Sequence, residues 1–139
     1  VYASTVINES LEDEYPYPPL MPKDSEGRAR ARMLEDYRDT HFNPPCVKII
    51  YEMRKPEGER DANVIATAKA DINKCFDRID MELQGKEYLA DAFSLADIAF
   101  MANLELLDRF QITVDPKYAN TTAWIARLKA RPSFAASAT

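Results

Sequence analysis

Apolar residues recur at helical spacing along most of this chain. The clearest run steps by three or four residues: Ile65, Ala68, Ile72, Phe76, Ile79 and Leu83. This spacing places all six side chains on one face of a helix. The run therefore predicts an amphipathic helix, and Gly85 is expected to stop it because glycine adopts the left-handed backbone that often follows a helix.

A second helical segment is expected over residues 25–52. Its apolar stripe is predicted to contain Ala29, Met33 and Tyr37, which are four residues apart. The proline pair at 44–45 removes two backbone donors, so the segment is expected to kink or split there.

The segment SLADIAFMANLELLDRF has the strongest local start signal in the chain. Ser94 is placed to cap the helix. Asp97, three residues later, is placed to accept a hydrogen bond from the Ser94 backbone N–H, and Phe93 can contact Ile98 across the helix start. The run of apolar residues that begins at Ile98 would cover every side of the helix, which predicts a central, buried position. A catalytic triad is not expected here because no histidine follows His41.

Shorter helices are expected near both ends of the chain. The first runs from Thr5 to about Glu14, with Ser4 as its N-cap. Its apolar side is predicted to contain Val6, Ile7 and Leu11, and four prolines stop it over residues 16–22.

The acidic run at residues 12–14 is expected to be a solvated helix end. The last helix covers about residues 121–130 and carries Trp124, Ile125 and Leu128 on one face, and a short turn follows from Pro132. The predicted class is thus all-α, a bundle of about five or six helices.

Composition narrows the possible partners. The chain has 139 residues, 46% of them hydrophobic, and a net charge of −5 without a basic run, so neither nucleic acid nor a membrane surface is expected as a partner. Without a long apolar span or a signal sequence, a cytoplasmic location is expected. Cys46 and Cys75 lack the spacing of a metal site or redox pair and are expected to be buried.

Three stretches of the sequence resemble soluble glutathione transferases. STVINESLEDEYPYPPLMPKDSEGRARAR is similar to the junction between the two domains of that family, YLADAFSLADIAF to the buried, capped helix of its all-α domain, and YANTTAWIARLKARPSF to its closing helix. The resemblance covers essentially the whole chain. It implies that residues 1–22 are a remnant of a thioredoxin-like domain, with Val1 and Tyr2 as the stub of its last strand, and that residues 23–139 form the all-α domain.

The resemblance also implies where glutathione would bind. In the family, the catalytic Ser, Cys or Tyr lies in the preceding domain, so this chain is not expected to catalyse alone. Ser4 matches the family serine that binds the γ-glutamyl carboxylate at a helix N-terminus. Ala3 departs from the family pattern, since a Glu or Gln that contacts the glutathione amine is usual there.

A second-substrate site is implied on the helix that lines the electrophile pocket in family members. Its candidate residues are Tyr37, His41, Phe42 and Cys46. Core packing explains Phe42 and Cys46 equally well, and His41 is also compatible with a packed or surface histidine.

The implied function of the intact protein is conjugation of glutathione, as co-substrate, to small apolar electrophiles. A homodimer is implied, with contacts through residues 25–52 and 61–84. The alternative is a non-catalytic adaptor with the transferase fold, which Ala3 fits. No metal site is expected.

Overall fold

The computed structural model describes residues 2–137, so Val1 of the predicted strand stub lies outside the described residues. Within that range the regular structure is helical, which confirms the all-α class. The elements are α1 (Ser4–Glu14), α2 (Ser25–Tyr37), η1 (Arg38–Phe42), α3 (Asn43–Arg54), η2 (Glu57–Glu59), α4 (Ala62–Glu82), α5 (Leu95–Arg109), α6 (Ala119–Lys129) and α7 (Pro132–Ser137).

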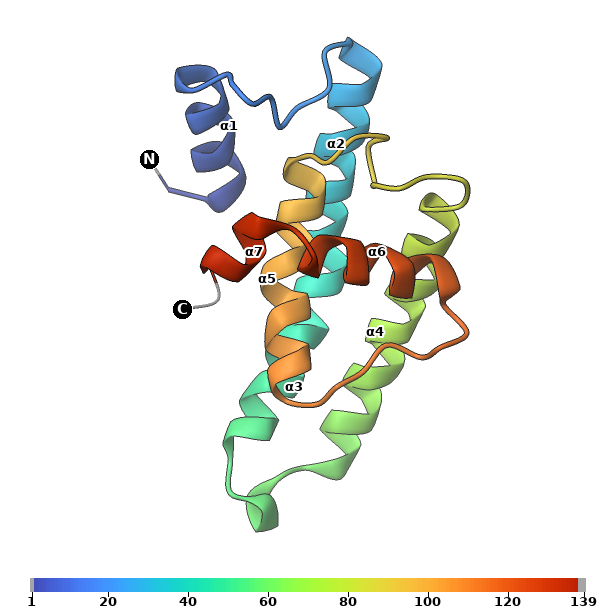
Figure 1. Ribbon diagram of the computed structural model, residues 1–139. Coiled ribbons are helices and arrows are strands. Elements are labelled where there is room, and N and C mark those ends of the chain that lie inside the picture. The colour runs from blue at the N-terminus through green and yellow to red at the C-terminus, as the bar shows by residue number, and fades with distance from the viewer. Residues whose placement is uncertain (1, 138–139) are drawn as a thin grey trace.

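Helix α5 occupies the middle of the bundle, as its apolar sequence predicts. It packs against α2 and α3, while α4 packs against α3 and α6 (Figure 1). Aromatic rings from different elements meet around it: Phe42 lies 5.2 Å from Phe100 and 5.5 Å from Phe76, and Phe100 lies 6.0 Å from Trp124, measured between ring centroids. Helix α1 stands apart at the upper left of Figure 1.

The start of α5 is fixed by the predicted capping pair. Ser94 is the N-cap, and the Asp97 carboxylate accepts hydrogen bonds from its backbone N–H (2.9 Å) and hydroxyl (3.1 Å). The other Asp97 oxygen accepts from the Leu89 N–H (3.1 Å) and from Trp124 Nε1 (2.8 Å). Burial raises the pKa of the Asp97 carboxyl, and these donors oppose that rise. The predicted structural role of Ser94 and Asp97 is confirmed.

The long segment expected over residues 25–52 is divided near its prolines, as predicted, because α2 ends at Tyr37 and α3 begins at Asn43. Pro44 and Pro45 lie in the first turn of α3, where a missing N–H does little harm. The π-helical turn η1 precedes them, and its wider turn joins the two helices. The His41 carbonyl there accepts a weak hydrogen bond from the Cys75 thiol at 3.5 Å.

Two predictions about the first helices are wrong. In α2 the buried apolar residues are Ala31 and Leu34, whereas Ala29 is exposed and Met33 is 47% exposed, because the side that packs against α5 is one residue out of phase with the predicted stripe. In α1 the N-cap is Ala3, whose carbonyl accepts the Ile7 N–H at 3.0 Å, so Ser4 is already the first helical residue.

The helix predicted from residue 65 to Gly85 is confirmed. Helix α4 ends at Glu82, and Gly85 follows with φ at 72°, a value that favours glycine. The N-cap of α4 is Asp61, whose carboxylate accepts a hydrogen bond from the Asn63 N–H at 2.9 Å.

Candidate functional site

Helix α1 presents its apolar side chains to solvent. Val6, Ile7 and Leu11 are all exposed, and no α1 residue is buried in the described structure. The helix is nevertheless joined to the bundle, because the Glu12 carboxylate accepts the N–H groups of Leu20 (2.9 Å) and Met21 (3.0 Å). Glu12 is therefore not the solvated residue that the acidic run predicts.

An apolar cleft of about 370 Å³ lies between the 15–24 segment, α5 and the C-terminal helices. The residues that line it are Pro18, Leu20, Phe93, Ile98, Met101, Leu128, Arg131, Ser133, Phe134 and Ser137. A neighbouring hollow of about 330 Å³ shares Pro18, Leu20 and Ile98 and extends to Leu11 and Tyr15. The two hollows and the exposed side of α1 form one surface, here called the apolar face.

Arg131 supplies a positive charge to the apolar face. Its guanidinium carbon lies 3.5 Å from the ring centroid of Phe93, a cation–π contact. Its Nε is buried and has no hydrogen-bond partner among residues 2–137. Phe93 and Ile98, predicted only as helix-start contacts, thus also line the cleft.

The four predicted electrophile-wall residues do not gather in one cavity. Phe42 and Cys46 are fully buried in the core, the packing role that the sequence also allows. Tyr37 and His41 stack on each other with ring centroids 4.8 Å apart, and Arg78 lies 4.6 Å from the Tyr37 ring. Burial raises the pKa of Tyr37 to about 12.

The residues implied to bind glutathione lie at the start of α1. Ala3 and Ser4 are both exposed. The first N–H groups of a helix have no partner within it, so this turn offers donors and a positive dipole end to an anion. Ala3 has φ at 71° and a methyl side chain that cannot bind an amine.

The described structure offers neither a metal centre nor a membrane span. Across residues 2–137, no three histidine, cysteine or carboxylate side chains gather closely enough to hold a metal ion. No helix in the described part of the chain combines the length and apolar character needed to cross a bilayer.

The sequence matches one protein family over most of its length. A model of the family described as "Glutathione S-transferase, C-terminal domain" matches residues 14–132. The chain belongs to the glutathione S-transferase family. Its match is to the all-α domain, in agreement with the helical bundle around α5.

Individual relatives of this glutathione S-transferase domain carry different names. Maleylpyruvate isomerase of Ralstonia sp. is 32% identical over 119 residues, which cover 81% of this chain and 56% of that protein. FtsZ-localized protein A of Caulobacter vibrioides is 28% identical over 134 residues, 92% of this chain and 59% of that protein. The chain therefore spans just over half the length of these curated relatives.

The solved structures similar to this glutathione S-transferase domain include ligand complexes. A glutathione S-transferase from Methylobacillus flagellatus, with glutathione bound, superposes with a TM-score of 0.81 at 29% identity. The match covers 98% of this chain and 68% of that one.

Sequence reasoning missed several residues of the apolar face in this transferase domain. Met101 is one of the consecutive apolar residues of α5 and was expected only to be buried. Arg131 and Phe134 flank Pro132, and only the fold brings them against α5 and the 15–24 segment. The available signal in the sequence was a basic residue directly before Pro132 and an aromatic residue two positions after it.

Proposed function

We propose that this chain is the all-α half of a glutathione-dependent enzyme that conjugates glutathione to small apolar electrophiles. The observation that carries the proposal is the apolar face, which is exposed over α1 and hollowed beside α5. A thioredoxin-like domain of the intact protein packs against this face, and residues 1–22 are its last part. The electrophile lies between the two domains, against apolar side chains of this one.

Glutathione binds in this proposal at the N-terminus of α1. Ser4 and the free N–H groups of the first turn bind its γ-glutamyl carboxylate, favoured by the positive end of the helix dipole. Ala3 makes no contact with the amine, which lowers affinity by about 1–3 kcal/mol relative to a family member with Glu.

A homodimer in the cytoplasm completes the proposal. Residues 25–52 and 61–84 form its contact surface. Support comes from four large apolar side chains that these helices expose, namely Met33, Val47, Tyr51 and Met81. Such side chains on neighbouring helices favour association because burying them removes apolar surface from water.

A second candidate is a binding module that has lost catalysis. Two observations favour it: Ala3 stands where the glutathione amine is usually bound, and FtsZ-localized protein A is 28% identical over 92% of this chain. In this case the apolar face or the helices of the dimer surface bind another protein.

One set of measurements on the full-length protein tests both candidates. Calorimetry measures glutathione binding, and absorbance follows conjugation to 1-chloro-2,4-dinitrobenzene and isomerisation of maleylpyruvate. Binding with conjugation supports the transferase. Isomerisation without conjugation would replace it with a glutathione-dependent isomerase. A protein that neither binds glutathione nor turns over, and that gains binding in Ala3→Glu, would be the non-catalytic module.

A further inference from the structure

A second cleft, of about 510 Å³, lies between α1 and α2 and is strongly acidic. Its lining residues are Thr5, Val6, Glu9, Ser10, Asp13, Arg32, Glu35, Asp36 and Asp39. On α1 the acidic cleft shares Val6 with the apolar face, whose hollow is lined there by Asn8, Leu11 and Glu12. Neither of the two apolar hollows shares a lining residue with the acidic cleft.

Glu35 lies at the floor of the acidic cleft. Glu35 is only 1% exposed. Neither of its carboxylate oxygens accepts a hydrogen bond from any of the described residues. A buried carboxylate without a partner is unfavourable, because it has lost its hydration and no hydrogen bond or ion pair compensates for that loss. A cation with hydrogen-bond donors placed in the cleft would satisfy it.

Arg32 and Arg38 act on Glu35 only at a distance, and neither donates a hydrogen bond to it. The Arg32 guanidinium donates to both oxygens of Glu9, at 2.6 and 2.8 Å, and Asp39 pairs with Arg38. Among residues 2–137, Asp13, Glu35 and Asp36 form no ion pair. The cleft thus holds five carboxyl groups against one guanidinium that is already paired.

These carboxyl groups are spread along the cleft. Glu9 and Asp13 are one turn apart on α1, with Cβ atoms about 5–6 Å apart, whereas Glu35 lies on α2 and Asp39 in the following turn η1. They do not form a group with the geometry of a metal site in the described structure. Negative charge distributed over two helices suits an extended ligand with several positive groups better than a single ion.

We propose that the acidic cleft binds a linear aliphatic polyamine, with one ammonium group donating to Glu35 and another lying between Asp13 and Asp36. An ammonium group carries three N–H donors and no acceptor, which complements a carboxylate with no donor of its own. The cleft volume is within the range of small-molecule sites. This inference goes beyond the proposed function. Four of the lining residues lie within residues 25–52, the proposed dimer surface, so a second copy of the chain would compete with the polyamine for the cleft.

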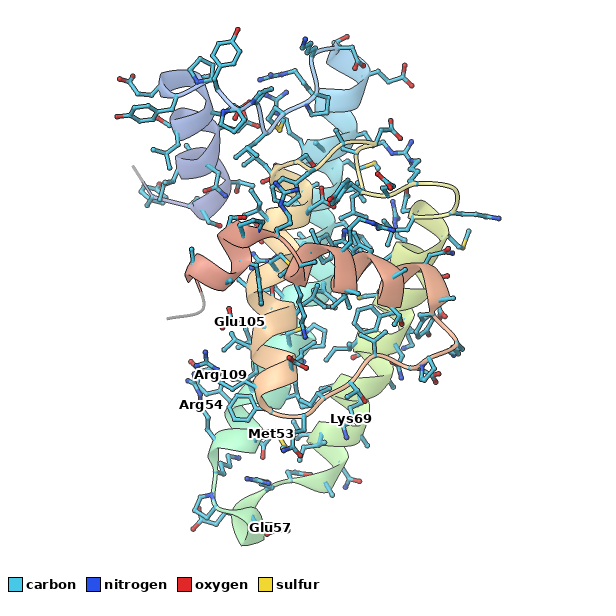
Figure 2. The ribbon with its side chains drawn as sticks, in the orientation of Figure 1. Met53, Arg54, Glu57, Lys69, Glu105 and Arg109 are labelled. Carbon is cyan, nitrogen blue, oxygen red and sulfur yellow. The ribbon has the colours of Figure 1, made fainter. Side chains whose placement is uncertain are left out.

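The test is calorimetric titration of spermidine into the 139-residue chain at low salt and about pH 8, where carboxyl groups are ionised. We expect one site, weakened at least about tenfold by Glu35→Gln, because a charge-assisted hydrogen bond is lost. Asp36→Asn, at an exposed position, is expected to weaken binding about threefold. Glu57→Gln is the matched control, since Glu57 is exposed at the far end of the molecule from α1 (Figure 2), and it should leave affinity unchanged.

A second readout separates Glu35 from general surface charge. Its pKa is raised to about 7, chiefly by burial and further by Glu9 and Asp39, so wild-type affinity should fall as pH drops through that value. Glu35→Gln should lack this fall. Circular dichroism confirms that the variant is folded.

Three results would overturn the proposal. One is equal affinity of Glu35→Gln and wild type, which would mean diffuse attraction to an acidic surface. Another is displacement of spermidine by an equal concentration of Mg²⁺, which would mean a metal site. The third is absence of spermidine binding together with weaker self-association of Glu35→Gln in sedimentation, which would assign the cleft to a second copy of the chain.

Discussion

The indole Nε1 of Trp124 donates a hydrogen bond of 2.8 Å to Oδ1 of Asp97, and so connects α6 to the first turn of α5. The same oxygen accepts the Leu89 N–H, from the loop before α5. With Ser94 bound to the other oxygen, one carboxylate joins three segments of the chain. The capping residue of α5 is therefore also a tertiary contact.

We expect Asp97→Ala to lower the free energy of unfolding by about 3–5 kcal/mol, because it leaves several buried donors without an acceptor. That exceeds the roughly 1 kcal/mol of a helix cap alone. Urea unfolding followed by circular dichroism measures the change. Asp97→Asn, which keeps one acceptor oxygen, should cost less, and a loss of only about 1 kcal/mol in Asp97→Ala would contradict the three-segment role.

Glu35 should make stability depend on pH. Its pKa in the folded protein is about 7, above its ordinary value of 4.5. The folded state therefore binds the proton more tightly than the unfolded state, and the resulting stabilisation is complete below about pH 4.5 and is lost as pH rises through about 7. Relative to Glu35→Gln, we expect wild type to lose about 3 kcal/mol over this interval. Chemical denaturation of both proteins at a series of pH values measures it, and parallel curves would rule the effect out.

The two thiols should resist modification in the folded protein. Cys46 and Cys75 are both free and buried, and burial raises the pKa of Cys46 to about 12. The thiolate is the reactive form, so we expect a disulfide reagent to label both at least about a hundredfold more slowly in buffer than in urea. Labelling is followed by absorbance, and rapid reaction of either thiol in buffer would be the contrary result.

Replacing Ala3 by glycine should stabilise the start of α1. The φ angle of Ala3 is 71°, a conformation that glycine adopts without the steric cost that a side chain incurs. We expect Ala3→Gly to raise stability by up to about 1 kcal/mol. Ala29→Gly, at an exposed position inside α2, is the control and should lower stability by about 1 kcal/mol. Thermal unfolding compares them, and destabilisation by both would refute the assignment.

The parts of the fold that follow from local signals were predictable from sequence. Helix α4 was visible because its apolar residues repeat at helical spacing over its whole length. The α5 start was visible because Ser94 and Asp97 interact three residues apart. In both cases the residues that decide the structure are neighbours in the sequence.

The remaining features depend on contacts between distant segments. Glu35 is polar, so no apolar pattern marks it as buried, and only the packing of α1 and α2 creates the cleft above it. The Trp124 contact to Asp97 spans two helices. The buried side of α2 was also predicted wrongly. Packing against α5 determines which side of α2 is buried, and the predicted stripe of Ala29, Met33 and Tyr37 carries no information on that contact.

The hydrogen bonds around Leu20 have a mechanical consequence. Glu12 of α1 binds the Leu20 N–H, and the Leu20 carbonyl accepts the Leu95 N–H at 2.9 Å, in the first turn of α5. Leu20 thus connects α1 to the start of α5, in addition to the Arg32–Glu9 ion pair that connects α1 to α2. The proline-rich segment therefore ties the C-terminal end of α1 to the start of α5.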